Sequence, residues 1–252
     1  MSCYSKLFDS SSEYKSIQHN IDRKLFPIGV LGLPPTPKAF LIHTLCENNP
    51  CGAVVLVPDE ATGEKLYTDL SVLGSKCVTY PARDFNFHSV EAGNREYEQK
   101  RIGALSKMIS GECDILIISA EAAMQKTLPK NILTERTFEL SQSMEISTDE
   151  VRKKLVGCGY SAADMVEGPG QFSLRGGILD IFPCNLENPV RIEFWGDEID
   201  TIAQFDIISQ RRTDNLDSIS LAPVSEILIE DKEAFAEKLS LLKKKHSHKK
   251  CR

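Results

Sequence analysis

Two short, continuous apolar runs constrain the fold of the first half of this chain more than any other feature. Ala53–Val57 reads AVVLV between a glycine and a proline, and Ile115–Ser119 reads ILIIS. Runs without polar alternation suit parallel strands, because helices cover both faces of a parallel sheet. The surrounding segments have helical periodicity, so the pattern predicts strands alternating with helices. We expect strands at Phe26–Leu31, Ala53–Val57, Cys77–Tyr80 and Ile115–Ser119, and helices within residues 1–24 and at Pro37–Cys46, Ala61–Leu73, Asn94–Ile109 and Glu121–Lys126.

Beyond about residue 130 the pattern changes to short strand-like segments separated by turns rich in Gly, Pro and Asn. Ser147-Thr148-Asp149-Glu150 predicts a helix N-terminus, with Ser147 as the cap. We expect strands at Thr137–Ser141, Phe172–Leu174, Ile178–Phe182, Val190–Phe194, Ile199–Phe205 and Ile219–Leu221. The predicted class is therefore α/β, with a parallel-sheet domain over residues 1–131 and a smaller, strand-rich α+β domain over residues 132–222. Residues 223–252 form a third segment, with a helix at Asp231–Lys245 and a basic tail.

Charge is distributed unevenly along the 252 residues. The chain has a net charge of −6, yet its last ten residues, KKKHSHKKCR, hold six Lys or Arg and no acid. The remainder carries 24 basic and 36 acidic residues, a balance of −12. Affinity for a nucleic-acid backbone comes mostly from cationic side chains. We therefore expect a solvated terminus here, and any weak, non-specific DNA contact is assigned to this tail.

Several classes of protein are disfavoured by the sequence. No apolar run approaches the roughly 20 residues that span a bilayer, and the polar N-terminus does not resemble a signal peptide. These features predict a cytoplasmic protein without a membrane partner. The eight cysteines form no CxxC pair, so we expect reduced thiols that pack as small apolar groups, and neither a metal site nor a cofactor.

A phosphate-loop pattern occurs in a form that should not bind nucleotide. Gly32 and Lys38 hold the spacing of G-x-x-x-x-G-K-[ST], but Pro37 replaces the second glycine and Ala39 replaces the metal-binding hydroxyl. The loop normally binds phosphate through backbone N–H groups, and its three prolines have none. We therefore predict a degenerate, inactive loop and no enzymatic activity.

A longer series of motifs carries a resemblance to a known family. YPARDFNFHS, then NREYEQKRIGALSKMISGECDILIIS, then GPGQFSLRGGILDIFPCNLENPVRIEFWGDEIDTIAQFD follow the degenerate loop in order. This arrangement resembles the domain shared by the excinuclease protein UvrB and the transcription-repair coupling factor, over roughly residues 25–230. UvrB has a working phosphate loop and a long Tyr-rich hairpin. Here only Asn86–Gly93 separates Phe85 from the next helix, so the coupling factor is the better match.

The resemblance implies a helicase-like first domain, a partner-binding second domain and a return segment after residue 222. It also implies that the family's RNA-polymerase-binding and DNA-translocating domains are absent from a chain of this length. The tail KKKHSHKKCR does not resemble family sequence. A fragment of a longer protein and a truncated reading frame both fit this observation.

The resemblance assigns the binding of the excinuclease protein UvrA to the second domain, at Arg175, Arg191 and Trp195. Independently, strand alternation predicts that Arg191, Glu193 and Trp195 share one face of their strand. Exposed Arg and Trp side chains are typical of interface hot spots. In the alternative interpretation, Trp195 packs inside the domain and Arg191 pairs with Glu193 or Asp197. Arg175 is less constrained, because Gly176-Gly177 could introduce a bulge.

Other motifs receive structural interpretations. The acidic cluster Asp197, Glu198 and Asp200 is expected to be solvated, and the helicase-like motif Tyr80–Phe85 is expected to shape the fold. Two functional alternatives remain open. One is an ATP-dependent repair protein related to UvrB, and the other is a DNA-binding module. The prolines of the loop argue against the first, and the acidic body argues against the second.

Overall fold

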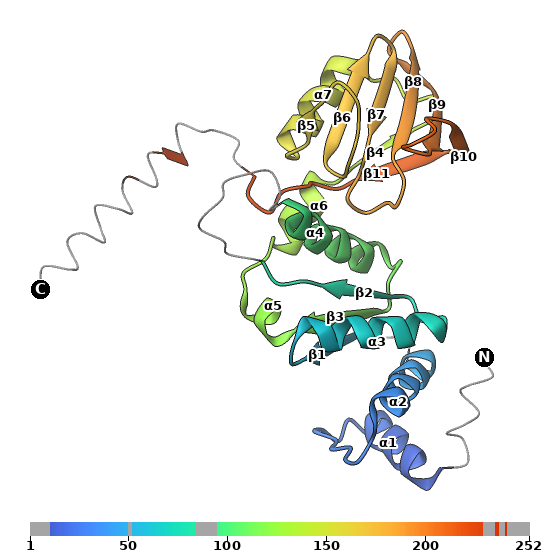
Figure 1. Cartoon of the computed structure of the whole chain (residues 1–252), viewed down its shortest axis with the longest axis vertical. Coiled ribbons are helices and arrows are strands. Elements are labelled where there is room, and N and C mark those ends of the chain that lie inside the picture. The colour runs from blue at the N-terminus through green and yellow to red at the C-terminus, as the bar shows by residue number, and fades with distance from the viewer. Residues whose placement is uncertain (1–10, 50–51, 84–94, 229–234, 237–239, 241–252) are drawn as a thin grey trace, which may run out of the picture. The chain divides into compact units, whose positions relative to one another are not determined.

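The computed structural model describes residues 11–49, 52–83, 95–228, 235–236 and 240. The chain divides into two compact units, Met1–Thr127 and Leu128–Arg252 (Figure 1). The first unit contains helices α1 (Ser12–Asp22), α2 (Pro35–Asn48), α3 (Glu60–Val72), α4 (Arg95–Ser110) and α5 (Ala120–Met124), and strands β1 (Ala53–Val57), β2 (Cys77–Tyr80) and β3 (Ile115–Ser119). No described helix is both long and apolar enough to cross a membrane.

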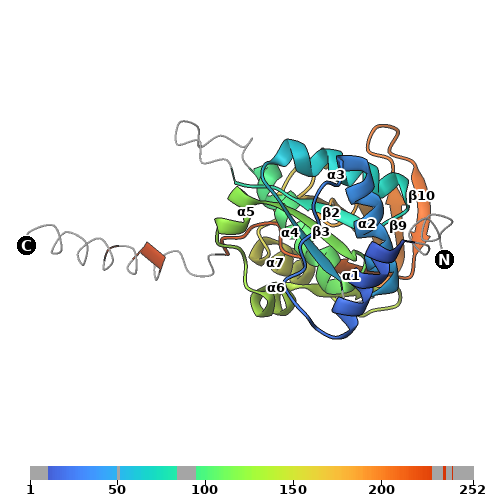
Figure 2. The same cartoon turned by 90° about the horizontal axis from the view of Figure 1, so that it is seen from below.

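The first unit is built on a three-stranded parallel sheet with the order β1-β3-β2. Its three strands have the bounds that the apolar runs predict. On one face, Ile115 and Ile117 of the central strand pack against apolar residues of α2 and α3. On the other face, Leu116 and Ile118 pack against α4 and α5. Figure 2 shows α2 and α3 near the sheet, in blue and cyan.

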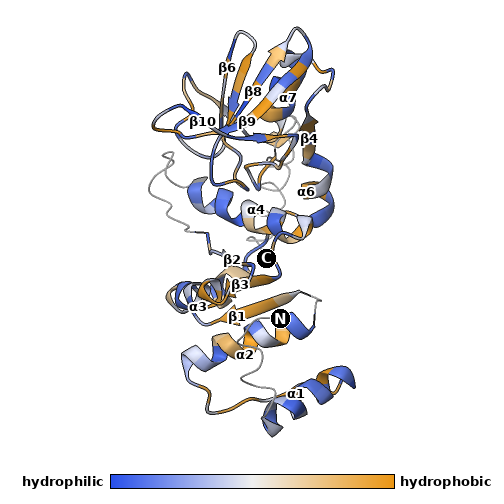
Figure 3. Ribbon diagram, turned by 90° about the vertical axis from the view of Figure 1, so that its right-hand side faces the viewer, coloured by the Kyte–Doolittle hydropathy of each residue, from blue (hydrophilic) through white to orange (hydrophobic). Residues whose placement is uncertain are grey.

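The apolar sequence of strand β1 predicts that both of its faces are covered, but one of them is exposed. The strand lies at the edge of the sheet, and Figure 3 shows it in hydrophobic colours. Val55 packs into the core under α2 and α3, but Val54 and Leu56 are 64% and 63% exposed. The expectation of two-sided burial holds for the central strand β3 and is wrong for β1, because helices α4 and α5 pack on β2 and β3.

The predicted strand Phe26–Leu31 is also wrong. Residues 25–31 have no regular secondary structure, and Leu25, Phe26, Val30 and Leu31 are all exposed. Pro27 cannot donate a hydrogen bond to a neighbouring strand, and Gly29 adds no side chain to pack. Apolar composition alone therefore did not distinguish this extended segment from a strand.

Tyr80 and Pro81, which begin the predicted helicase-like motif, contact Arg101 of α4, whereas Asp84 and Phe85 of this motif lie outside the described residues. The Arg101 side chain is fully buried, and its guanidinium lies 4.2 Å from the centre of the Tyr80 ring. Arg101 also donates hydrogen bonds to the carbonyl oxygens of Pro81 (2.9 Å) and Lys126 (3.2 Å). Burial lowers the pKa of Arg101 from its ordinary value. These contacts join α4 to the segments after β2 and α5, as a motif that shapes the fold would.

The second unit contains helices α6 (Lys130–Arg136) and α7 (Thr148–Gly157). Its strands are β4 (Phe138–Ser141), β5 (Ser161–Ala162), β6 (Gln171–Arg175), β7 (Ile178–Ile181), β8 (Val190–Trp195), β9 (Glu198–Phe205), β10 (Arg212–Leu216) and β11 (Ser218–Leu221). A six-stranded sheet has the order β10-β9-β8-β7-β6-β5, and β11 pairs with β4. All of these pairs except β5–β6 are antiparallel. The chain is thus mixed α/β, and most of its strand pairs are antiparallel.

One face of the six-stranded sheet forms the core of the second unit. Leu179, Ile181, Val190 and Ile192 of the central strands pack with Val151 and Leu155 of α7. Ser147 caps this helix as predicted, because its hydroxyl accepts a hydrogen bond from the Glu150 N–H. Strands β5 and β10 and helix α6 were not predicted. The predicted helix Asp231–Lys245 lies largely outside the described residues, and Asn86–Gly93 and the basic tail lie entirely outside them.

Candidate partner-binding face

The degenerate phosphate loop leads into α2 without a preceding strand. Helix α2 begins at Pro35, with Pro34 as its N-cap and Pro37 in its first turn. Of residues 34–37 only Thr36 has a backbone N–H, and the N–H of Lys38 already donates to the carbonyl oxygen of Pro34. This helix end therefore lacks the row of N–H groups that binds phosphate at other helix N-termini.

Residues 32, 38 and 39 do not compensate for the missing donors. Gly32 adopts a positive φ of 79° in a bend, and Lys38 is exposed. Ala39 is fully buried in the core between α2 and the sheet. A hydroxyl at this position would therefore face apolar side chains rather than a metal ion.

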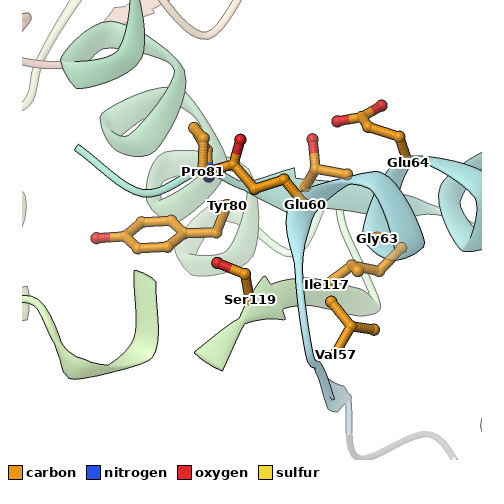
Figure 4. A pocket seen from close by; sticks show the side chains of 9 residues that line it. Val57, Glu60, Gly63, Glu64, Tyr80, Pro81, Ile117 and Ser119 are labelled. Carbon is orange, nitrogen blue, oxygen red and sulfur yellow. The ribbon is translucent and has the colours of Figure 1, made fainter. Parts of the chain in front are cut away.

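A small pocket lies at the carboxyl ends of the parallel strands, where α/β sheets commonly bind ligands. Val57, Tyr80 and Ser119 line it from the three strands, with Glu60 and Glu64 from α3 (Figure 4). Its volume of about 30 Å³ leaves room for a few water molecules and not for a nucleotide. The Glu60 carboxylate accepts a hydrogen bond from the Ala82 N–H (2.6 Å), so it joins α3 to the segment after β2.

The acidic cluster and the thiols do not form a metal-binding group within the described ranges. No group of three or more His, Cys, Asp or Glu side chains there could hold a metal ion. Cys46, Cys77, Cys113, Cys158 and Cys184 form no disulfide bond. Burial raises the pKa of Cys77, Cys113 and Cys158, which disfavours their reactive thiolate form.

The second unit presents the sheet face that lies opposite its core, and we call this the outer face. On β8, Val190 and Ile192 are fully buried in the core and Phe194 packs partly against it. Arg191, Glu193 and Trp195 therefore point to the outer face. The register shift between β8 and β9 places the extra residue, Asp200, on β9, so the alternation of β8 is uninterrupted.

Arg175 joins the outer face from β6. The pairing of β6 with β7 is continuous from Phe172–Ile181 to Arg175–Ile178, with Gly176-Gly177 as the turn and no bulge. Gly176 has a positive φ of 60°, and a Cβ on Gly177 would lie 3.0 Å from the carbonyl oxygen of Phe194. The two glycines thus bring the turn close to β8 without changing which way Arg175 points.

Asp180 links the two arginines. It lies directly across from Arg191 in the register of β7 and β8, and it is 2% exposed. Arg191 donates to both carboxylate oxygens, from Nε to Oδ1 (2.7 Å) and from a terminal nitrogen to Oδ2 (2.9 Å). Arg175 donates to Oδ2 at 3.1 Å. The hydrogen bond with Asp180 raises the pKa of Arg191.

Arg191 and Arg175 differ in how much surface they leave to a partner. The Arg191 side chain is 18% exposed, because it also lies over the Phe205 ring (4.6 Å) and donates to Gln210. The Arg175 side chain is 56% exposed. Arg191 lies on the face that strand alternation predicts, but the alternative pairing with Glu193 or Asp197 is wrong, since its hydrogen-bonding partner is Asp180.

Glu193 forms a second ion pair on the outer face. Its carboxylate pairs with Arg212 of β10 and accepts a hydrogen bond from Thr201 of β9. The hydrogen bond from Arg212 is the main cause that lowers the pKa of Glu193. Arg212 was missed from the sequence because β10 is polar and was not recognised as a strand.

Trp195, at the end of β8, is the most prominent apolar side chain of the outer face. It is 84% exposed, so it does not pack inside the domain. Ile178 of β7 is also exposed on this face, and it lies across from both Arg175 and Glu193 in the register. An exposed indole that shares its sheet face with exposed guanidinium and aliphatic groups has the composition of a protein-binding surface.

Comparisons with known proteins found one similarity within the second unit and others over most of the chain. Residues 138–227, which include the entire six-stranded sheet, match the family described as "UvrB interaction domain". The transcription-repair-coupling factor of Bacillus subtilis is 28% identical over 88% of this chain, and that of Haemophilus influenzae is 30% identical over 79%. The chain spans 19% and 17% of the lengths of these two relatives. Residues 138–227 therefore resemble UvrB interaction domains, in a chain that is similar over most of its length to a part of the transcription-repair-coupling factors.

Proposed function

We propose that this chain is a non-catalytic docking module of transcription-coupled nucleotide excision repair and that it recruits the excinuclease protein UvrA. The observation that carries the proposal is the exposure of Trp195 and Arg175 on the same face of the sheet, within residues that match the UvrB interaction domain. Trp and Arg are the residue types most enriched among the side chains that dominate binding energy at protein interfaces. Partner binding gives that surface a function.

Within the proposed docking surface, the three predicted residues take different roles. Trp195 is the apolar anchor. Truncating an aromatic side chain that a partner buries typically costs about 2 kcal/mol or more of binding free energy. Arg175 contributes a guanidinium that is mostly free to hydrogen-bond with the partner. Arg191 mainly supports the surface through Asp180, since little of its side chain is exposed.

The proposal excludes nucleotide hydrolysis for reasons of backbone chemistry. Three prolines remove N–H donors where the phosphate loop would need them, and the buried Ala39 cannot supply a metal ligand. We propose that residues 1–131 are a degenerate helicase-like domain, that residues 132–222 are the partner-binding domain, and that residues 223–252 begin a return segment. In a longer protein of this family, contacts with RNA polymerase and DNA would belong to other segments.

The proposed docking surface is tested by calorimetric titration of purified UvrA with the Trp195→Ala variant. We expect the affinity to fall by roughly thirtyfold, the equivalent of about 2 kcal/mol, with an unchanged melting temperature. Wild-type affinity in this variant would remove the outer face as the docking site.

A suitable control is Met124→Ala, because Met124 is a similarly exposed apolar residue (89%) of the first unit. We expect its affinity to equal that of the wild type. Asp59 of the first unit is not suitable, since its carboxylate accepts the N–H of Thr62 and caps α3. Its replacement by Ala would therefore remove this cap and destabilise the helix.

A further inference from the structure

We propose that Asp180 is a positioning residue that holds Arg175 in place to receive a carboxylate of the protein partner. This inference rests on the proposed function, because it concerns the same docking surface. Its starting point is the bridge in which one buried carboxylate accepts hydrogen bonds from the guanidinium groups of both Arg175 and Arg191.

The location of Asp180 indicates that its role lies on the outer face. Its strand neighbours Leu179 and Ile181 are fully buried in the core, so the Asp180 side chain points away from that core. A desolvated carboxylate is unfavourable unless it is paired and hydrogen-bonded. Arg191 supplies a two-point pairing and is itself fixed by Phe205 and Gln210. The Asp180–Arg191 pair is therefore a rigid base.

Arg175 is attached to this base by a single hydrogen bond. That bond, to Oδ2 of Asp180, is its one interaction among the described residues, so the remaining N–H groups of its guanidinium are open. A long side chain loses substantial rotamer entropy when a partner orders it. By holding the guanidinium against the sheet before the partner arrives, Asp180 reduces that loss.

The charge of the bridge indicates what the partner offers. Two guanidinium groups share one carboxylate, which leaves one net positive charge at a site where Arg175 remains exposed. An incoming carboxylate satisfies both the charge and the fork of donors. An extended nucleic-acid backbone would also meet Glu198 at the Trp195 end of the same face, whereas Glu193 is already paired with Arg212. We therefore assign the site to an acidic side chain of a protein.

The test is a double-mutant cycle in the full chain, titrated with UvrA. Asp180→Asn keeps the shape of the side chain and removes its charge. We expect Asp180→Asn and Arg175→Ala each to weaken binding on the order of tenfold. In the Arg175→Ala background, Asp180→Asn should change the affinity by less than about threefold, because its effect passes through Arg175. The effect of Arg175→Ala should also shrink as salt is raised.

The control is Asp149→Asn, which removes a carboxylate paired with Arg152 on α7, on the core side of the sheet. It should bind as the wild type does. Equal effects of Asp180→Asn with and without Arg175 would overturn the positioning role. If Asp180→Asn does not fold, Arg175→Ala with wild-type affinity would overturn it as well. Normal binding by Asp180→Asn together with weak binding by Trp195→Ala refutes this inference alone, whereas normal binding by both refutes the proposed function. If the wild type retards DNA and Arg175→Ala abolishes that retardation, the group that Arg175 binds is a phosphate rather than a carboxylate.

Discussion

Two arginines of the outer face show that the same side chain can take different structural roles. Arg175 and Arg191 have the same side chain and share the carboxylate of Asp180. Arg191 has one further acceptor and an aromatic contact, whereas Arg175 remains largely in solvent. The family resemblance assigns both to a partner, but their contacts give them unequal parts in the stability of the fold.

This inequality leads to a prediction about stability. Arg191→Ala removes a two-point charged pairing and leaves the buried Asp180 with its weaker partner, so we expect a loss of about 2 kcal/mol in the free energy of unfolding. Arg175→Ala should cost less than about 0.5 kcal/mol, because an exposed ion pair contributes little. Urea denaturation of the two variants measures both values. Equal losses would contradict the roles assigned to the two arginines.

Glu193 gives a prediction about pH. Its pKa is lowered in the folded chain by the hydrogen bond from Arg212, so the folded state favours the charged form. The resulting stabilisation is complete above the unfolded pKa of about 4.3 and is lost as the pH falls through the lower, folded value. Glu193→Gln should therefore be less stable than the wild type at pH 7, with a difference that shrinks below about pH 4.

Thermal melts across this range, with Arg212→Gln as the control background, check the prediction. Once Arg212 is absent, Glu193→Gln should make a much smaller and less pH-dependent difference, because the main cause of the lowered pKa is gone. A difference that persists at low pH in the wild-type background would mean that Glu193 contributes through packing rather than charge.

Residue patterns predicted the direction of side chains better than their partners. Alternation correctly placed Arg191, Glu193 and Trp195 on one face, because the period of a strand is local. The pairing of Arg191 with Asp180 depends on the register between β7 and β8, which turn lengths and cross-strand packing decide. The role of Arg212 depended on β10, whose polar sequence RTDNL contains no apolar alternation.

At the scale of elements, apolar runs predicted strands well where another strand lies alongside. AVVLV and ILIIS pair along their whole lengths in β1 and β3. Phe26–Leu31 is similarly apolar but pairs with nothing in the described chain, and its Pro27 and Gly29 weaken any strand. Burial was less predictable than strand formation, because it depends on where helices pack. Val54 and Leu56 remain exposed for that reason.

Helix α2 carries a prediction about nucleotide binding. Its first turn lacks N–H donors at Pro34, Pro35 and Pro37, so phosphate has no backbone cradle there. We expect that millimolar Mg-ATP leaves the melting temperature unchanged and that no ATP is hydrolysed. A ligand that bound with a millimolar or lower dissociation constant would raise the apparent stability. A reproducible rise in melting temperature, absent with Mg²⁺ alone, would contradict the prediction.

At the scale of the whole chain, the core residues of the first unit and those of the second unit form separate sets. The core beneath the six-stranded sheet is formed by residues between Leu140 and Val224, all in the second unit. The two cores around the parallel sheet are formed by residues between Ala39 and Ala122, all in the first unit. Each unit therefore has apolar core residues of its own, which is the property that lets a domain fold alone.

The last prediction follows from this separation of cores. Residues 128–252, expressed alone, should fold cooperatively and bind UvrA within about threefold of the affinity of the whole chain, a difference of less than about 1 kcal/mol. The reason is that the core, the sheet and the proposed contacts of Arg175 and Trp195 all lie within this segment. Calorimetric titration and a thermal melt of the fragment provide the measurement, with residues 1–127 as the matched control that should not bind. Docking by residues 1–127, or a well-folded second fragment that fails to bind, would show that the partner depends on the first unit.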